Sequence, residues 1–333
     1  MPISATSSGR CKFICASWAL GALLLLSALF SLCTGASGLS LMEAFREPSS
    51  PAALILWHVR LPRTVAAMLS GAALAASGAV IQGVLHNPLA GPNIIGVNAG
   101  AGFAALLISW LWPGLANWLP AAAFAGALGA SLIILLLVQR TRASRLTIVL
   151  AGVAISAILS AGSDLITTLA PEVSLGMTAF RVGGFSGVSA GRVYGAACYI
   201  LPGLSLALYL AHDLDVLALG DDVAQSVGLR VKTTRLMLLC LASLLAGAAV
   251  SFSGLIGFLG LIVPHLVRRL AGGEYRRILP LSMLGGALLM LLCDTAARTL
   301  FAPYELPVGI LLSLIGGPFF LFLLLRQRKG GKR

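Results

Sequence analysis

Long apolar runs alternate with short polar segments along almost the whole chain. A membrane-spanning helix needs about 20 consecutive apolar residues, and runs of that length recur from near the N-terminus to the tail. The pattern predicts an all-α integral membrane protein, folded as a single domain over residues 1–333. We expect about ten spans. They cover residues 13–33, 63–85, 93–112, 119–138, 147–169, 192–211, 234–253, 255–270, 280–301 and 307–325.

A polar island, His212–Lys232, separates the sixth and seventh predicted spans and carries four of the eleven acidic residues. Charged groups in hydrocarbon are too costly, so this segment must lie in water. Gly220 and Asp221 predict a helix start within it, and Gly228 predicts the stop. A helix of roughly two turns is not stable alone in water. We interpret the island as a docking element, the alternative being an ordinary solvated loop.

Two other polar segments connect predicted spans on the opposite side of the membrane. Thr34–Leu61 is expected to be an external loop with a short interfacial helix, and Pro171–Arg192 an external connector that also holds a short helix. The apolar run that begins at Phe13 exceeds the ~7–15 residues of a signal-peptide core, so we expect an uncleaved first span.

Composition and charge agree with this picture. Hydrophobic residues make up 58% of the chain and charged residues 10%. The net charge of +12 does not indicate nucleic-acid binding, because the basic residues punctuate span ends instead of lining one face. Five segments, among them both termini and the polar island, hold 17 of the 23 Lys and Arg. The positive-inside rule then places both termini and the polar island in the cytoplasm.

An internal repeat predicts a transporter. Residues 69–78 (LSGAALAASG) and 245–254 (LAGAAVSFSG) agree at six of ten positions without gaps. Because the second span would run inward and the seventh outward, the repeat is inverted, as in proteins whose two halves rock about a central site. Chance similarity between two helices rich in small residues is the alternative.

Candidate chemistry is sparse. The four histidines have no metal-ligand spacing, and no catalytic or metal-binding constellation stands out. The six cysteines form no CxxC pair and are interpreted as small buried hydrophobes. Asp164 could line a path, and Asp294 is interpreted as an i,i+4 partner of Arg298. Without a GxxxxGK loop, the chain cannot bind ATP by that route, so any ATP-driven motor must be another chain.

Four blocks in order resemble the FecCD family of ABC importer permeases, which carry iron–siderophore complexes, haem or vitamin B12. The resemblance is nearest to the vitamin B12 importer branch. The blocks are Arg60–Gly102, Ala218–Leu229, Ser253–Gly272 and Glu305–Phe320.

The resemblance implies a type II importer permease in the bacterial inner membrane. Its expected partners are a second copy of the chain, surrounding lipid, two cytoplasmic ATPase subunits and a periplasmic or lipoprotein substrate-binding protein. ATP and Mg²⁺ would bind the ATPase subunits, and no cofactor would bind this chain.

The resemblance also implies three sets of site residues. ATPase coupling falls on the helix of the polar island, and the cytoplasmic gate on Asn87 and Leu89. Docking of the binding protein falls on Arg60, Arg63 and Arg298, which we expect at the outer face; lipid headgroup contact is the alternative. Loop Arg140–Thr147, a candidate second gate segment, departs from the vitamin B12 pattern. The coupling residues are Leu219, Gly220, Asp221, Val223, Ala224, Val227 and Gly228.

The leading interpretation is a permease for ferric siderophores, followed by cobalamin and haem. A different class is an ion-coupled secondary transporter in which Asp164 carries the ion. Such a carrier would have no need for a docking helix in the polar island. An intramembrane enzyme would need paired catalytic residues at one depth, and none are evident.

Overall fold

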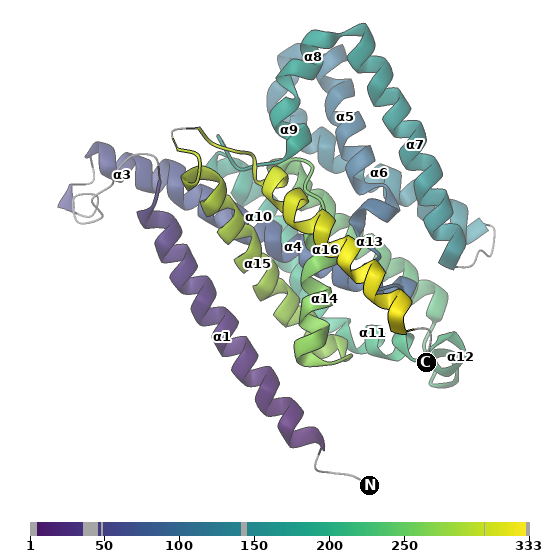
Figure 1. Cartoon of the computed structure of the whole chain (residues 1–333). Coiled ribbons are helices and arrows are strands. Elements are labelled where there is room, and N and C mark those ends of the chain that lie inside the picture. The colour runs from purple at the N-terminus through teal and green to yellow at the C-terminus, as the bar shows by residue number, and fades with distance from the viewer. Residues whose placement is uncertain (1–4, 36–45, 48, 141–144, 303, 331–333) are drawn as a thin grey trace.

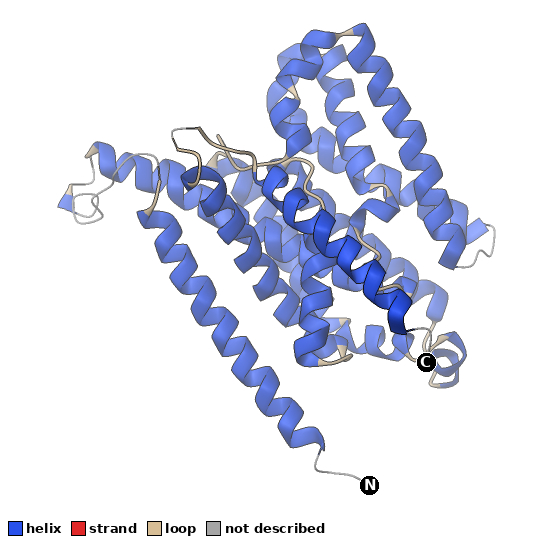
Figure 2. Ribbon diagram, in the orientation of Figure 1, coloured by secondary structure: helices blue, strands red, loops and turns tan. Residues whose placement is uncertain are grey.

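A computed structural model describes residues 5–35, 46–47, 49–140, 145–302 and 304–330. Within these ranges the chain folds into helices joined by turns, without a strand (Figure 2). The all-α prediction is confirmed. Residues 141–144 of the candidate second gate segment lie outside the described residues, as do residues 36–45 and 48 of the predicted external loop.

A long helix coincides with each predicted span. Their bounds are α1 (Ala5–Cys33), α4 (Leu61–Leu85), α5 (Val97–Leu111), α6 (Leu119–Arg140), α7 (Arg145–Leu169), α10 (Ala190–Tyr209), α13 (Val231–Ser253), α14 (Leu259–Ala271), α15 (Tyr275–Thr299) and α16 (Val308–Gly330).

Not every one of these helices could cross a membrane unaided. Among the described residues, six helical segments are long and apolar enough to do so. A seventh forms if α10 and α11 (Ala211–Ala218), which bend by 49°, count as one span. The shortest are α14, with 13 residues, and α5, with 15. Both are short because each begins after a break in the chain.

The second span begins earlier than predicted. Ser50 caps α3 (Pro51–Ile55), which continues through a π-helical turn, η1 (Leu56–Arg60), into α4. The helical run therefore covers 35 residues, up to Leu85. The helix runs through Pro62 because the π-helical turn accommodates a proline that lacks an N–H donor, and α3 with η1 provides the short helix expected in the preceding loop.

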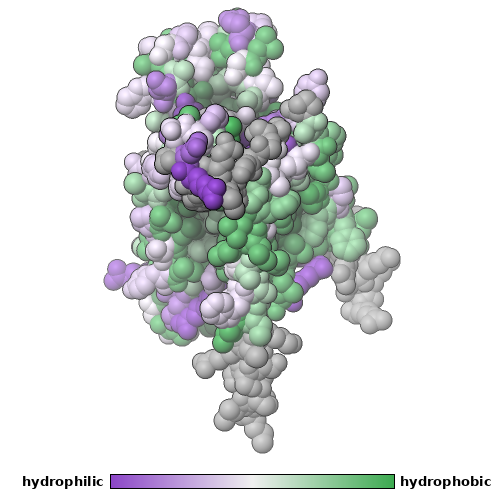
Figure 3. Space-filling view, turned by 90° about the vertical axis from the view of Figure 1, so that its left-hand side faces the viewer, coloured by the Kyte–Doolittle hydropathy of each residue, from purple (hydrophilic) through white to green (hydrophobic). Residues whose placement is uncertain are grey.

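Short helices mark the two ends of the bundle. The predicted connector holds α8 (Pro171–Gly176) and α9 (Thr178–Val182), and the polar island holds α11 and α12 (Asp221–Ser226). Figure 1 shows α11 and α12 at the end where α16 finishes, with α8 and α9 at the opposite end. Figure 3 shows a hydrophobic band across the middle of one face, with most hydrophilic residues above and below it. This distribution fits a protein that crosses a bilayer.

The centre of the bundle is α4, whose most apolar 18-residue window is 83% buried. Its small residues let neighbouring backbones approach closely. A Cβ added at Gly71 would lie 2.2 Å from the Gly286 carbonyl oxygen of α15, and one at Gly78 would lie 1.8 Å from the Gly260 oxygen of α14. By contrast, none of the corresponding window of α1 is buried, so this helix presents its apolar surface outward, toward lipid.

The inverted repeat is visible in these contacts. Gly71 of α4 packs against Gly286 of α15, and the matching residue of α13, Gly247, packs against Ala127 of α6. The two repeated helices also contact each other, since the Ser77 hydroxyl donates to the Ala242 carbonyl oxygen at 2.7 Å. Each repeat thus supplies one central helix and one partner helix at a close glycine contact.

Candidate translocation and coupling sites

Two breaks in the helical chain meet inside the bundle. The first follows α4, where His86 takes a left-handed conformation and leads through a turn, Asn87–Leu89, into the 3-10 helix η2 (Pro92–Ile95). The second lies between α13 and α14 and ends at Phe258. The side-chain oxygen of Asn87 accepts from the Leu89 N–H at 2.9 Å and so fixes the shape of the turn.

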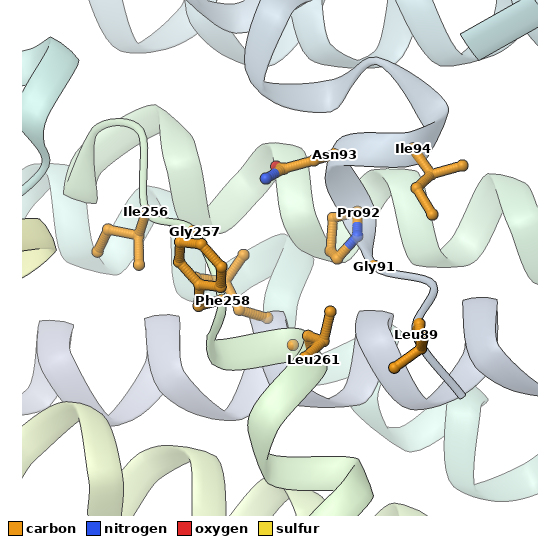
Figure 4. Close-up of a pocket in the computed structure, with 11 residues that line it drawn as sticks. Leu89, Gly91, Pro92, Asn93, Ile94, Ile256, Gly257, Phe258 and Leu261 are labelled. Atoms are coloured by element: carbon orange, nitrogen blue, oxygen red, sulfur yellow. The ribbon is translucent and has the colours of Figure 1, made fainter. Parts of the chain in front are cut away.

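A pocket of about 120 Å³ lies between the two breaks. Its lining is mostly apolar, and Asn93 is its one polar side chain (Figure 4). The lining residues are Leu74, Leu89, Gly91, Pro92, Asn93, Ile94, Ile256, Gly257, Phe258, Gly260 and Leu261. Leu89 therefore lies at the pocket, whereas Asn87 shapes the turn without lining it.

The pocket lies about half-way along the central helix α4. Leu74, one of its lining residues, is close to the midpoint of α4. Because α14 has 13 residues, it is about 20 Å long, shorter than the roughly 30 Å hydrocarbon core. Its start at Leu259 is therefore inside the bilayer. Irregular backbone at this depth is tolerated where it is buried in protein or lines a cavity.

The helix of the polar island on which the predicted coupling residues fall is α12 (Asp221–Ser226). Val223 and Val227 are 45% and 66% exposed, and Leu219 just before the helix is 68% exposed. Ala224, also predicted to be a coupling residue and so expected to face outward, is instead fully buried against the bundle, and that expectation is wrong. The exposed apolar surface, which we call the coupling face, consists of Leu219, Val223 and Val227.

Ion pairs and hydrogen bonds hold the polar island to the long helices. Asp221 pairs with Arg235 of α13 at 2.8 Å. Asp215 accepts from the backbone N–H groups of Tyr275 and Arg276, which caps the N-terminus of α15. These contacts fix the polar island, and with it the coupling face, to α13 and α15, although α12 has only six residues.

His86 connects the polar island to the turn that leads to the pocket. Its Nε2 lies 2.8 Å from the Leu217 carbonyl oxygen at the end of α11 and donates to it. Leu214 of α11 packs against Gly83, where an added Cβ would meet the leucine side chain at 2.8 Å. No local pattern in the sequence indicates this link, because it joins residues about 130 positions apart.

The three arginines expected to face the binding protein are buried. Arg60, Arg63 and Arg298 are 4%, 8% and 4% exposed. Arg63 pairs with Asp294 at 3.0 Å and with Glu305 at 2.8 Å. The expected outward geometry is wrong because the buried carboxylate of Asp294, the partly exposed carboxylate of Glu305 and carbonyl groups at the end of α1 draw these side chains inward. Their role in docking stays a prediction.

The other two arginines hold α1 against the bundle. Arg298 donates to the hydroxyl of Ser31 and to the carbonyl oxygen of Thr34, and Arg60 donates to the carbonyl oxygens of Leu32 and Cys33. Asp294 lies 3.8 Å from Arg298, so the i,i+4 pair exists but is secondary to the pair with Arg63. All three arginines therefore join elements within the chain.

The remaining candidates do not form a site. Asp164 is exposed on α7, and the described residues contain no group of three or more His, Cys, Asp or Glu that could hold a metal ion. The interpretation of the cysteines as buried is confirmed for Cys293 but wrong for Cys15, Cys33 and Cys198, which are exposed. On membrane helices, outward-facing cysteines can lie against lipid as small apolar groups.

Comparison with known protein families shows to which family the chain belongs. The model of the FecCD transport family matches residues 23–326. The chain belongs to the FecCD transport family. A solved metal-chelate type ABC transporter in an inward-facing conformation is 31% identical, with a TM-score of 0.82 over 94% of this chain and 99% of that one. The FecCD fold and the type II importer architecture thus agree.

Several FecCD relatives are similar over most of their length. A hemin transport permease of Yersinia pestis is 40% identical over 92% of this chain and 94% of its own. An iron(3+)-hydroxamate import permease of Bacillus subtilis is 40% identical over 92% and 82%. An Fe(3+) dicitrate transport permease of Escherichia coli is 40% identical over 82% and 86%.

Proposed function

We propose that this FecCD chain is the membrane permease of an ATP-driven importer that carries a ferric siderophore across the inner membrane. Relatives named for hydroxamate and citrate chelates of iron support this substrate class. Hemin is the second candidate, because an equally similar relative carries that name. The chain would perform no chemistry on its substrate, and its task would be to open and close a path.

The observation that carries the proposal is the coupling face. Leu219, Val223 and Val227 expose large apolar side chains on a polar island that must lie in water. Isolated exposed apolar residues are common, but three together on a short, firmly anchored element indicate a docking surface. The proposed partner is an ATPase subunit that supplies ATP and Mg²⁺.

The complete importer would contain two copies of this chain, two ATPase subunits and a substrate-binding protein. Both termini would be cytoplasmic. The N-terminal end of α1 and the C-terminal end of α16 lie toward the side of the bundle that carries α11 and α12 (Figure 1), and the segments on that side are rich in lysine and arginine. The binding protein would then approach the end that carries α8 and α9. Asn87 and Leu89 would belong to the gate on the path between these two ends.

The double substitution Val223→Asp, Val227→Asp should uncouple the permease from its ATPase. Two carboxylates placed in an apolar contact would be desolvated without partners, and we expect binding of the ATPase to weaken about tenfold or more. Copurification with the ATPase and binding-protein-stimulated ATP hydrolysis would both be measured. The matched control is Gln225→Asp, which adds one carboxylate at an exposed position on the other side of α12. Normal ATP-dependent transport by the double variant would disprove docking at the coupling face.

A further inference from the structure

Each repeat contains one break in its helical chain, and each break packs closely against a glycine of a long helix. The Ile94 carbonyl oxygen would be only 1.8 Å from a Cβ at Gly152 of α7, and the Phe258 Cγ only 2.4 Å from a Cβ at Gly316 of α16. Ile94 and Phe258 are 164 residues apart, as are Gly152 and Gly316. The two broken segments are therefore counterparts, each pressed into a notch left by a glycine on a long helix.

Backbone strain is found at these two breaks and at no other non-glycine position among the described residues. His86 has φ 50° and Phe258 has φ 63°. The left-handed region is unfavourable for a residue with a side chain, most for bulky ones such as phenylalanine. Strain of this kind persists where surrounding structure enforces it, often in parts that switch.

Contacts on both sides hold Phe258 in its strained position. Its carbonyl oxygen accepts the first helical hydrogen bonds of α14, from Leu261 and Ile262 at 2.9 Å each. On the preceding side, the Leu255 N–H donates to the Phe180 carbonyl oxygen at 2.9 Å. The aromatic ring thus has a defined place, between the notch at Gly316 and the pocket.

We propose that Phe258 is a gate residue that closes the path at mid-depth together with Leu89. This inference rests on the proposed function and adds a residue of the second repeat to the gate. Both side chains line the same pocket, and Figure 4 shows Leu261 between them. A hydrophobic constriction of this kind stops passage by excluding water as well as solute. The gate opens when the Phe258 ring leaves the notch at Gly316.

The gate is connected to the polar island on both sides. His86 ties the turn of Leu89 to the Leu217 carbonyl oxygen of α11. Gln82 donates to the Gly260 carbonyl oxygen near Phe258 at 3.3 Å and accepts from Arg268 at 2.9 Å. Arg268 in turn donates to the Tyr275 hydroxyl at 2.8 Å, and the Tyr275 N–H donates to Asp215 of the island. Movement of the island can therefore reach both gate residues through short polar contacts.

A passive leak measurement tests the role of Phe258. Permease dimers would be reconstituted in liposomes loaded with a radiolabelled ferric trihydroxamate, and its efflux followed without ATP. We expect Phe258→Ala to raise efflux about tenfold, because removal of the ring opens the hydrophobic constriction. Leu89→Ala should act in the same direction. The matched control is Phe319→Ala, which removes a ring from α16 that contacts His265 at 6.0 Å and does not line the pocket.

A second variant keeps the test valid if Phe258→Ala fails to fold. Gly316→Ala leaves the ring intact but fills its notch, so it should also raise efflux. Tight liposomes with folded Phe258→Ala, or with folded Gly316→Ala if the first variant is lost, would overturn the gate assignment. ATP-dependent uptake by the wild-type transporter would be measured alongside. If the wild type takes up the substrate while the variants do not leak, only the gate assignment fails; if the wild type shows no uptake, the proposed function fails.

Discussion

Replacement of Asp294 by alanine should destabilise the permease by about 3–5 kcal/mol, because it leaves two buried guanidinium groups without their shared carboxylate. Asp294 is 1% exposed and accepts from Arg63 through three contacts of 3.0 to 3.1 Å. The Nε atom of Arg298 lies 3.8 Å from the second carboxylate oxygen of Asp294. Glu305 would remain as a carboxylate partner of Arg63, but its side chain is 39% exposed and it reaches only one nitrogen of the guanidinium.

The loss would be measured as a lower melting temperature of the detergent-purified protein and a lower yield in the membrane. Asp294→Asn should fall between the wild type and the alanine variant, since an amide keeps an acceptor but loses the charge. Asp164→Ala is the matched control, because it removes an exposed aspartate from another long helix. Equal melting temperatures for Asp294→Ala and Asp164→Ala would contradict the proposed role of the buried pair.

Gly78→Ala should have an effect of similar size, although it adds only one carbon atom. That carbon would lie 1.8 Å from the Gly260 carbonyl oxygen and 2.6 Å from its Cα, so backbone would have to move. The two helices would separate where the pocket is built, since Gly260 is part of its lining. We expect a destabilisation of about 3 kcal/mol, at the upper end for an overpacked core, and transport close to background.

Gly129→Ala on α6 is the control for Gly78→Ala. Nothing lies within 4 Å of a Cβ added there, and the residue is in the interior of a helix. Alanine should therefore stabilise that helix by roughly 0.5–1 kcal/mol. Transport and melting temperature would be recorded for both variants. If the two alanine variants behave alike, the close approach of α4 and α14 is not as tight as the structure indicates.

Apolar periodicity was sufficient to predict the helices and the place of the polar island. Long apolar runs in this chain have no soluble alternative, so the all-α membrane class and the order of the long helices follow from length and hydropathy. Breaks were harder to predict. The eighth span was expected from residue 255, but the chain is irregular until Phe258, because Gly254 takes φ 73° and Leu255 bonds to Phe180 of another segment.

Among the site residues, those with a local signal in the sequence were predicted, and those whose surroundings come from distant segments were not. Leu89, which lines the pocket, was named because the turn that holds it resembles a FecCD motif, and that resemblance is carried by a short local stretch of sequence. The burial of Arg63 depends on Asp294 and Glu305, which lie more than 230 residues further along, and no local pattern reports them. Ala224 was misplaced because a helix of six residues has too few turns for periodicity to fix which side faces the bundle.

Reconstituted uptake would show whether the permease imports a ferric hydroxamate with the help of an ATPase. The permease and its ATPase would be placed in liposomes containing ATP, and a binding protein loaded with a radiolabelled ferric hydroxamate would be added outside. We expect label to accumulate only with ATP and a hydrolysis-competent ATPase, and to be unaffected by ionophores that dissipate proton and sodium gradients. Accumulation by the permease alone, driven by an ion gradient and lost in Asp164→Asn, would instead identify a secondary transporter and contradict the account.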